Sequence, residues 1–393
     1  MSACPLSSTR PNQRFTPEGG EALEEHLERT CSRVLHAVRA LIPPAKLEAV
    51  YLGGGYGRGE GGVLVTERGE RPYNDLEFYV FAGGNRHLNE WRHARALDVL
   101  GEILTPSAGA HVEFKIASGR EFERQPISMF SYDLVSAHRV LFGSDYYFQR
   151  CSHHCHAPKI PLAEATRLLM NRCSGLLFAR ELLENAAFTP ADADFVSRNI
   201  AKAQLALGDA VLTVFHRYHW SCKERHRRLK HDLALANAPA WREEILRLHV
   251  DGVRFKLHPT CSTESRDQLR ARWEQLLPHA LQVWLWVEEQ RLGLPFANAR
   301  HYALEMHAKD SAGGSPRKLA AQLWQNGARG LLSGQPLRSP RERLLRSLTL
   351  LLWEPEALTH PRLVMRLQRE LHSDAVALPA FVRAYREIWR RAN

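Results

Sequence analysis

The sequence of 393 residues lacks long apolar runs. The longest lies near residues 348–353 and is far shorter than the roughly 20 residues that a membrane-spanning helix needs. The segment before Thr16 is polar and contains proline, so it does not resemble a secretory signal. These absences exclude a membrane protein and lead us to expect a cytoplasmic one.

Cysteine is also scarce, with seven residues spread along the chain. An odd number in a long chain does not form a disulfide framework, so we expect a reducing compartment. The exception is segment 151–156, which reads CSHHCH and offers five potential metal ligands. They crowd together without a second pair at a zinc spacing, so a polar linker is favoured over a structural metal.

Internal repeats and long low-complexity tracts are absent, and 44% hydrophobic with 24% charged residues is ordinary for a globular protein. The formal charge of +10 attracts polyanions such as nucleotides or nucleic acid. Net charge indicates which partners a protein attracts, and it does not indicate the fold.

The most informative segment is 53–60, which reads GGGYGRGE. Glycines allow backbone N–H groups to wrap an anion. Segments 74–78, NDLEF, and 111–115, HVEFK, follow it and read as strands. Together they predict a phosphate cradle beside a set of metal-binding carboxylates.

Strand geometry decides how the acids of these segments are arranged. Residues two apart share a face, so Asp75 and Glu77 project together. Glu113 joins them if its strand is a neighbour, and three such acids would hold one or two magnesium ions. The alternatives are solvated acids on an exposed strand face and a glycine segment that is only a hairpin turn.

The periodicity predicts a helix over residues 18–41 and strands over Leu47–Leu52, Leu76–Phe81 and His111–Ala117. Between the last two strands, helical spacing predicts a crossover helix whose apolar face holds Leu88, Trp91, Leu97, Leu100 and Leu104.

Beyond residue 161 the pattern is helical, with helices expected around 162–186, 192–217, 239–256, 264–292, 315–327, 339–353 and 376–391. The fold class is therefore α+β, a small mixed-sheet domain followed by a larger all-helical one. We expect an N-terminal helical extension over 1–45, a catalytic domain over 46–160 and a helical domain over 161–393.

These motifs resemble the nucleotidyltransferase superfamily that includes DNA polymerase beta and the aminoglycoside nucleotidyltransferases. Its pattern is a glycine turn, an acid-x-acid strand and a third acid on a later strand. The turn at residues 54–60 is especially similar to that of the bacterial uridylyltransferases that modify nitrogen-signalling proteins. Two later segments, 132–145 and 171–177 with 202–209, are similar to small bacterial members that carry a helical C-terminal domain.

The resemblance implies that Asp75 and Glu77 bind metal and that Glu113 binds metal or acts as general base. It further implies that the turn holds the β- and γ-phosphates through Gly54, Gly55, Tyr56, Gly57, Arg58 and Gly59. A basic residue of the helical domain often reaches the triphosphate in this superfamily, and Lys202 is the candidate, against an ordinary solvated lysine.

The chain departs from the family pattern at two points. First, 19 residues separate Gly55 from Asp75, more than is usual. A small hairpin of 63–66 and 71–73 around a turn at 67–70 accounts for the surplus, unless it displaces the glycine turn from the acids. Second, the second acid is Glu77 rather than aspartate, as in antibiotic-modifying members.

Basic clusters lie at residues 223–230, 338–346 and 383–391. Glutamates interrupt them at helical spacing, so salt-bridged helix faces are favoured over a nucleic-acid surface.

The expected function is magnesium-dependent transfer of a nucleoside monophosphate, most simply AMP from ATP, to a hydroxyl of a small molecule or protein. Two magnesium ions are expected, and pyrophosphate is the second product. The alternatives are a nucleotide-binding regulatory protein without turnover and an RNA-directed transferase.

Overall fold

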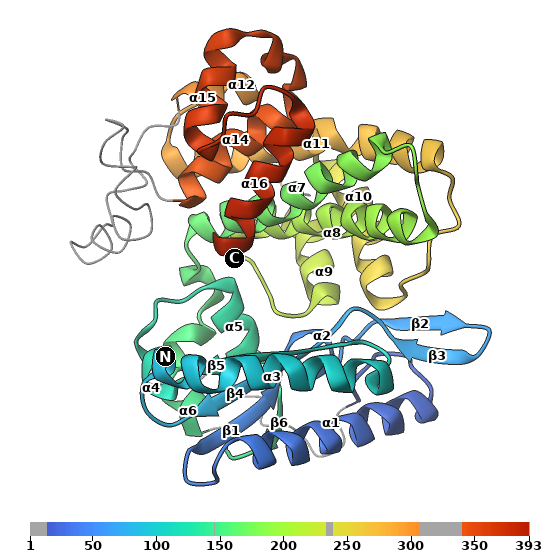
Figure 1. Ribbon diagram of the computed structural model, residues 1–393, viewed down its shortest axis with the longest axis vertical. Coiled ribbons are helices and arrows are strands. Elements are labelled where there is room, and N and C mark those ends of the chain that lie inside the picture. The colour runs from blue at the N-terminus through green and yellow to red at the C-terminus, as the bar shows by residue number, and fades with distance from the viewer. Residues whose placement is uncertain (1–13, 145, 233–238, 306–339, 393) are drawn as a thin grey trace. The chain divides into compact units, whose positions relative to one another are not determined.

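The computed structural model describes residues 14–144, 146–232, 239–305 and 340–392 (Figure 1). It has the expected α+β class, with a mixed sheet and its helices in the N-terminal part and helices in most of the rest. The chain forms two compact units, one of residues 1–165 with 211–261 and one of residues 166–210 with 262–393. The first unit thus takes in residues 211–261, which the sequence analysis groups with the helical domain.

The four-stranded sheet of the first unit has the order β5-β4-β1-β6. Its strands are β1 (Leu47–Leu52), β4 (Asp75–Ala82), β5 (His111–Ala117) and β6 (Arg139–Phe142). β4 and β5 are parallel and are joined by the helix α3 (Arg86–Ala108), as a parallel pair requires. β1 pairs antiparallel with both β4 and β6, so the sheet is mixed.

A separate hairpin follows the glycine turn. β2 (Val63–Thr66) and β3 (Gly69–Pro72) pair antiparallel, with Val63 opposite Pro72 and Thr66 opposite Gly69. The prediction that the surplus residues form a small hairpin is confirmed.

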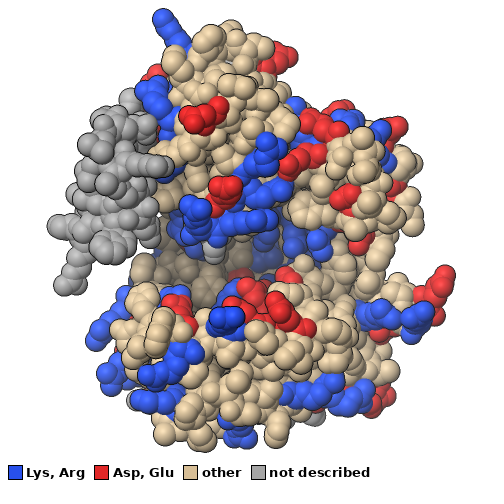
Figure 2. Space-filling view, viewed as in Figure 1, with Lys and Arg blue, Asp and Glu red and all other residues tan. Residues whose placement is uncertain are grey.

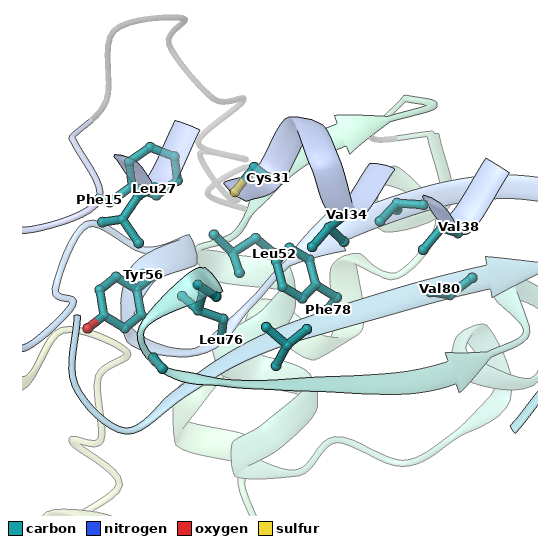
Figure 3. Packing of buried hydrophobic residues seen from close by; sticks show 14 of the residues in the cluster. Phe15, Leu27, Cys31, Val34, Val38, Leu52, Tyr56, Leu76, Phe78 and Val80 are labelled. Carbon is teal, nitrogen blue, oxygen red and sulfur yellow. The ribbon is translucent and has the colours of Figure 1, made fainter. Parts of the chain in front are cut away.

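One face of the sheet is covered by α1 (Glu21–Leu41) and α3. Figure 3 shows Leu27, Val34 and Val38 of α1 over Phe78 and Val80 of the sheet. These side chains are almost fully buried, and their burial is the main stabilising contribution of this layer.

The second face is covered by shorter helices. They are α4 (Gly119–Arg124), α5 (Met129–Ser136), α6 (Tyr146–Gln149) and η1 (Ser152–Cys155). Tyr51, Phe81, Phe122 and Phe148 pack together there. Because side chains alternate along β4, this is also the face toward which Asp75 and Glu77 project.

The first unit is completed by α9 (Cys222–Asp232) and α10 (Arg242–Leu257). The chain passes through the second unit before it reaches them, by way of α7 (Leu162–Glu184) and α8 (Pro190–Val214). The short helix η2 (Ala157–Lys159) precedes α7 and belongs to the first unit. The second unit further contains α11 (Arg266–Leu292), α12 (Ala299–Glu305), α14 (Pro340–Trp353), η4 (Pro355–Thr359), α15 (Pro361–Leu371) and α16 (Leu378–Ala392).

Most expected elements are present, but α9, α12 and α15 were not anticipated. The helix expected at 315–327 lies outside the described residues. Leu88 and Trp91 do not belong to the buried face of α3, because both are exposed, whereas Leu97 is buried. Among the helices that the structure describes, each is too short or too polar to cross a bilayer.

Candidate active site

The three predicted acids lie on neighbouring strands. In the parallel register of β4 and β5, Glu77 stands directly opposite Glu113, and Asp75 stands opposite His111. The side chains of Asp75, Glu77 and Glu113 are 35%, 30% and 41% exposed. Three half-exposed carboxylates therefore share one face at the beginning of two adjacent strands, because residues in register project to the same side.

Core packing fixes the direction of these carboxylates. Leu76 and Phe78 of β4 and Val112 of β5 are buried on the opposite face of the sheet. A slip of one residue would bury the acids and expose the apolar side chains, so the register is strongly determined.

Asn74 precedes the first acid in a left-handed conformation, with φ of 71°. Such a conformation is uncommon outside glycine and is retained where the surroundings impose it. The Asn74 side-chain amide donates to Asp75 Oδ2 at 2.6 Å, and the His111 N–H donates to the Asn74 carbonyl at 3.1 Å. Asn74 thus holds the Asp75 carboxylate and links the starts of β4 and β5.

The glycine turn adjoins the acids. The Gly53 N–H donates to the backbone carbonyl of Glu77 at 2.9 Å. A Cβ on Gly53 would come within 2.4 Å of the Tyr79 ring, and one on Gly54 would lie 3.2 Å from Glu77 Oε1. The β2–β3 hairpin therefore does not displace the turn from the acids.

The turn continues as the short helix α2 (Gly54–Gly57). The N–H groups of Gly57 and Glu60 donate to carbonyls within the turn. Within the described residues, the N–H groups of Gly54 and Gly55 donate to no carbonyl or side chain. These two backbone N–H groups can donate to a phosphate, and the three carboxylates beside them can bind the cation that accompanies it.

Tyr56 supports the turn from inside. It is buried, and its hydroxyl donates to the Gly62 carbonyl at 2.7 Å and accepts from the Tyr73 N–H at 2.7 Å. Burial is the main reason why its pKa is raised, and the phenol stays protonated. Its side chain is therefore a structural part of the turn, which leaves the backbone as the part that meets a ligand.

Arg58, which the resemblance implies contacts phosphate, is buried and paired with an acid. Its Nη1 lies 2.9 Å from Asp133 Oδ2 of α5, and its side chain is only 11% exposed. Burial lowers the pKa of Arg58, but Asp133, Tyr218 and Glu60 together raise it overall. Tyr218 also donates to Asp133, at 3.3 Å, and accepts from Arg225 at 2.9 Å.

Glu60 is likewise buried, not an exposed turn charge. Its carboxylate accepts from Ser221 Oγ at 2.5 Å and from the Cys222 N–H at 2.9 Å, at the first residue of α9. Burial alone would raise the pKa of Glu60, but Lys256, these hydrogen bonds and Arg58 lower it to about 2. The glycine turn is thereby tied to α9 by a buried, charged hydrogen-bond network.

Lys256 of α10 belongs to the same network, and no motif in the sequence marks it. Its backbone carbonyl lies against Gly62, where an added Cβ would approach it to 2.8 Å. Burial and the nearby Arg58 lower the pKa of Lys256. Around the turn, the arginines Arg58 and Arg225 balance the carboxylates Glu60 and Asp133, and Lys256 lies beside them.

Lys115 lies between two of the acids. Its Nζ is 3.3 Å from Glu113 Oε2 and 3.7 Å from Glu77 Oε2. The strand register brings it there, because Lys115 follows Glu113 on the same face of β5. The spacing of Glu113 and Lys115 was visible in the sequence, but the ion pair to Glu77 depends on the strand pairing.

Tyr79 holds the Glu77 carboxylate by a hydrogen bond. Its hydroxyl donates to Glu77 Oε2 at 2.6 Å. Burial, and then the negative charge of Glu77, raises the pKa of Tyr79, so the phenol remains a donor.

Whether these residues fit magnesium can be judged from the donors they offer. No group of three or more His, Cys, Asp and Glu side chains in the described ranges is arranged to hold a metal ion. Magnesium in nucleotide sites is commonly bound through one or two carboxylates together with substrate phosphates. Asp75 and Glu77 fit one such ion, whereas Glu113 faces the Lys115 ammonium.

Other predicted positions lie elsewhere. Lys202 is on α8 in the second unit, and its contact with a triphosphate stays a prediction. Cys151 and His154 are buried, and His154 Nε2 lies 3.0 Å from the Phe122 carbonyl, so this segment packs under the sheet. In the basic cluster of α9, Arg227 and Arg228 both pair with Glu224, as the salt-bridged interpretation expects.

On the face that Figure 2 shows, charges of both signs are interspersed, and acidic side chains gather in one area of the first unit. A scan against protein-family models finds no match, and no curated protein matches the sequence. The class of protein is therefore argued from the site itself.

Proposed function

We propose that this protein is a magnesium-dependent nucleotidyltransferase that transfers a nucleoside monophosphate, most simply AMP from ATP, to a hydroxyl group and releases pyrophosphate. The observation that carries the proposal is the meeting of the glycine turn with the acids, through the bond from the Gly53 N–H to the Glu77 carbonyl. Enzymes that transfer nucleotide phosphates need donors that hold the phosphate groups and carboxylates that bind the accompanying cation.

The acids have distinct roles in this proposal. Asp75, held by Asn74, and Glu77, held by Tyr79, are the carboxylates that would bind magnesium. When bound, the ion neutralises phosphate charge and orients the α-phosphate for in-line displacement. Glu113 remains to accept the proton of the attacking hydroxyl, provided that this oxygen lies within hydrogen-bonding reach.

The positive groups hold the remaining phosphate charge. The N–H groups of Gly54 and Gly55 are donors for the β- and γ-phosphate oxygens. Lys115 supplies a fixed cation beside Glu113. The chain therefore provides for itself part of the positive charge that a second magnesium ion would bring.

The acceptor is a small molecule or a protein in this proposal. Arg227 and Arg228 of α9 are engaged with Glu224, which does not favour a nucleic-acid acceptor. Two arginines of another basic cluster, Arg343 and Arg346, are buried in α14.

The test is release of pyrophosphate from each of the four NTPs with magnesium and a pool of cellular metabolites as acceptors. We expect release from one NTP by the wild type and a loss of at least about 1,000-fold in Asp75→Asn, because the variant keeps the fold but loses the charge that binds the cation. Asp98→Asn, an exposed acid on α3, is the matched control. Normal turnover by Asp75→Asn would refute the assignment.

A nucleotide-binding protein without turnover is the second candidate. The ion pairs of Lys115 with both Glu77 and Glu113 favour it, because they occupy acids that catalysis requires. Calorimetry separates the two: nucleotide binding that is independent of magnesium, together with no pyrophosphate release, would support the second candidate.

A further inference from the structure

The outer face of α3 carries large apolar side chains that are exposed in the part of the chain that the structure describes. Leu88, Trp91, Val99 and Ile103 are 49%, 81%, 47% and 67% exposed. Their spacing of three, eight and four residues, with Arg95 between, aligns them along one side of the helix. A row of this kind on a globular protein marks an interaction surface more often than chance exposure.

The row is not needed by the core of the first unit. The inner side of α3 already packs through Leu97, Gly101 and Ala108. A Cβ on Gly101 would lie 2.5 Å from the Val112 carbonyl, so the helix is as close to β5 as it can be. Trp91 and its neighbours therefore have no place to pack within their own layer.

Charged side chains beside the row are distributed unevenly. Arg92 and Arg95 lie in the N-terminal half of α3, and Asp98 and Glu102 lie in the C-terminal half. Within the described part of the chain, none of these four forms an ion pair or a hydrogen bond. The face thus has a positive half and a negative half around apolar side chains.

Such a face is complementary to itself when turned around. In an antiparallel pair with Trp91 opposite Ile103 of the second copy, Arg92 and Arg95 of each helix lie opposite Glu102 and Asp98 of the other. Each ion pair is made twice because a two-fold axis repeats every contact. A parallel arrangement would set like charges together and is disfavoured.

We propose that the exposed face of α3 binds the same face of a second copy of this chain, as an antiparallel two-fold dimer. Trp91 is the apolar anchor, since large aromatic side chains supply most of the energy of small interfaces. Uncharged atoms cover much of the drawn face of the first unit on which α3 lies (Figures 1 and 2).

The dimer leaves the candidate active site open. α3 covers one face of the sheet, and Asp75, Glu77 and Glu113 project from the other. The proposal is therefore independent of the nucleotidyltransferase assignment, and either can fail alone. One helix per subunit is a small contact, so the dimer forms in a concentration-dependent way.

Sedimentation equilibrium of the full chain over a wide concentration range tests the proposal. The wild type should pass from monomer to dimer, and Trp91→Glu should weaken the dimer at least about tenfold, because the glutamate replaces the anchor on both copies. Val65→Glu is the matched control, because Val65 of β2 is 73% exposed and lies off this face. A wild type that stays monomeric, or a Trp91→Glu variant that dimerises normally, overturns the proposal.

Charge exchange tests the antiparallel arrangement. The variant R92E/R95E makes the face acidic, and D98R/E102R makes it basic, so each alone should remain monomeric. Mixed in equal amounts, they should form a heterodimer, because every opposed charge is again of opposite sign. Failure to form it, while circular dichroism shows both variants folded, would refute the antiparallel pairing.

Discussion

A single side chain, Lys115, supplies positive charge beside the acids when no ligand is bound. Lys115 lies 3.3 Å from Glu113 and 3.7 Å from Glu77, so two opposed carboxylates are partly neutralised by the chain itself. At this scale the carboxylates were predictable from the two-residue spacing. The neutralising lysine was not recognised, because its role depends on which strand lies beside it.

Replacing Lys115 by methionine keeps the length of the side chain and removes its charge. We expect Lys115→Met to bind divalent cations several-fold more tightly in the absence of nucleotide, because Glu77 and Glu113 would face each other without a counter-charge. Titration with Mn²⁺, followed by electron paramagnetic resonance, measures this. Lys46→Met, which removes an exposed lysine, is the control, and cation binding equal to that of the wild type in Lys115→Met would contradict the role given to Lys115.

Gly54 provides a second test at the scale of one residue. Gly54→Ala places a methyl group 3.2 Å from Glu77 Oε1 at a φ of 61°. We expect the affinity for nucleotide, measured by calorimetry, to fall at least about tenfold, because the turn and the carboxylate must move apart.

Gly69→Ala in the hairpin separates backbone strain from this effect. Gly69 also has a positive φ, of 102°, but an added Cβ would meet nothing within 4 Å. Both variants should lose some stability, and only Gly54→Ala should lose affinity. An equal loss of affinity in both would remove the argument for contact with Glu77.

Among the elements, the junction of the glycine turn with α9 is set by one buried carboxylate. Glu60 accepts hydrogen bonds at the N-terminus of α9, where a negative charge is stabilised by the exposed N–H groups of the helix. Its pKa is lowered to about 2, so Glu60 stabilises the folded state at pH values above about 4.5 and ceases to do so as the pH falls toward 2.

Glu60→Gln should therefore reduce the free energy of unfolding by on the order of 3 kcal/mol at neutral pH. It should also flatten the decline of stability between pH 4.5 and pH 2, because the group that takes up the proton on unfolding is gone. Urea unfolding at several pH values measures both. Glu67→Gln, at an exposed position, should leave the curve of the wild type unchanged, and a Glu60→Gln curve of the wild-type shape would contradict the linkage.

Helices and strands were predicted correctly where a segment followed a single hydrophobic periodicity, that of a helix or that of a strand. β1 and β5 have the predicted bounds, and the hairpin of β2 and β3 follows from its turn residues. α3 was predicted as a helix, and Leu97, Leu100 and Leu104 of its predicted apolar face pack against the core, but Leu88 and Trp91 are exposed. Spacing identifies a side of a helix, but it does not reveal what covers that side.

At the scale of the whole molecule, the division of the chain could not be obtained from patterns. Residues 211–261 belong to the first unit, and the contacts that tie them there join residues more than 80 positions apart, such as Tyr218 with Asp133 and Cys222 with Glu60. No local periodicity records such pairs. The class α+β was predictable, since it needs only the order of strands and helices.

The discontinuity of the first unit bears on how the protein is made. A ribosome delivers the strands, the glycine turn and all three acids long before it delivers α9 and α10. Until then Glu60 lacks Ser221 and the Cys222 N–H, which compensate for its burial, so the nascent N-terminal region cannot complete its packing. Synthesis must continue to about residue 261 before this region can complete its fold. The candidate active site is therefore completed late in translation.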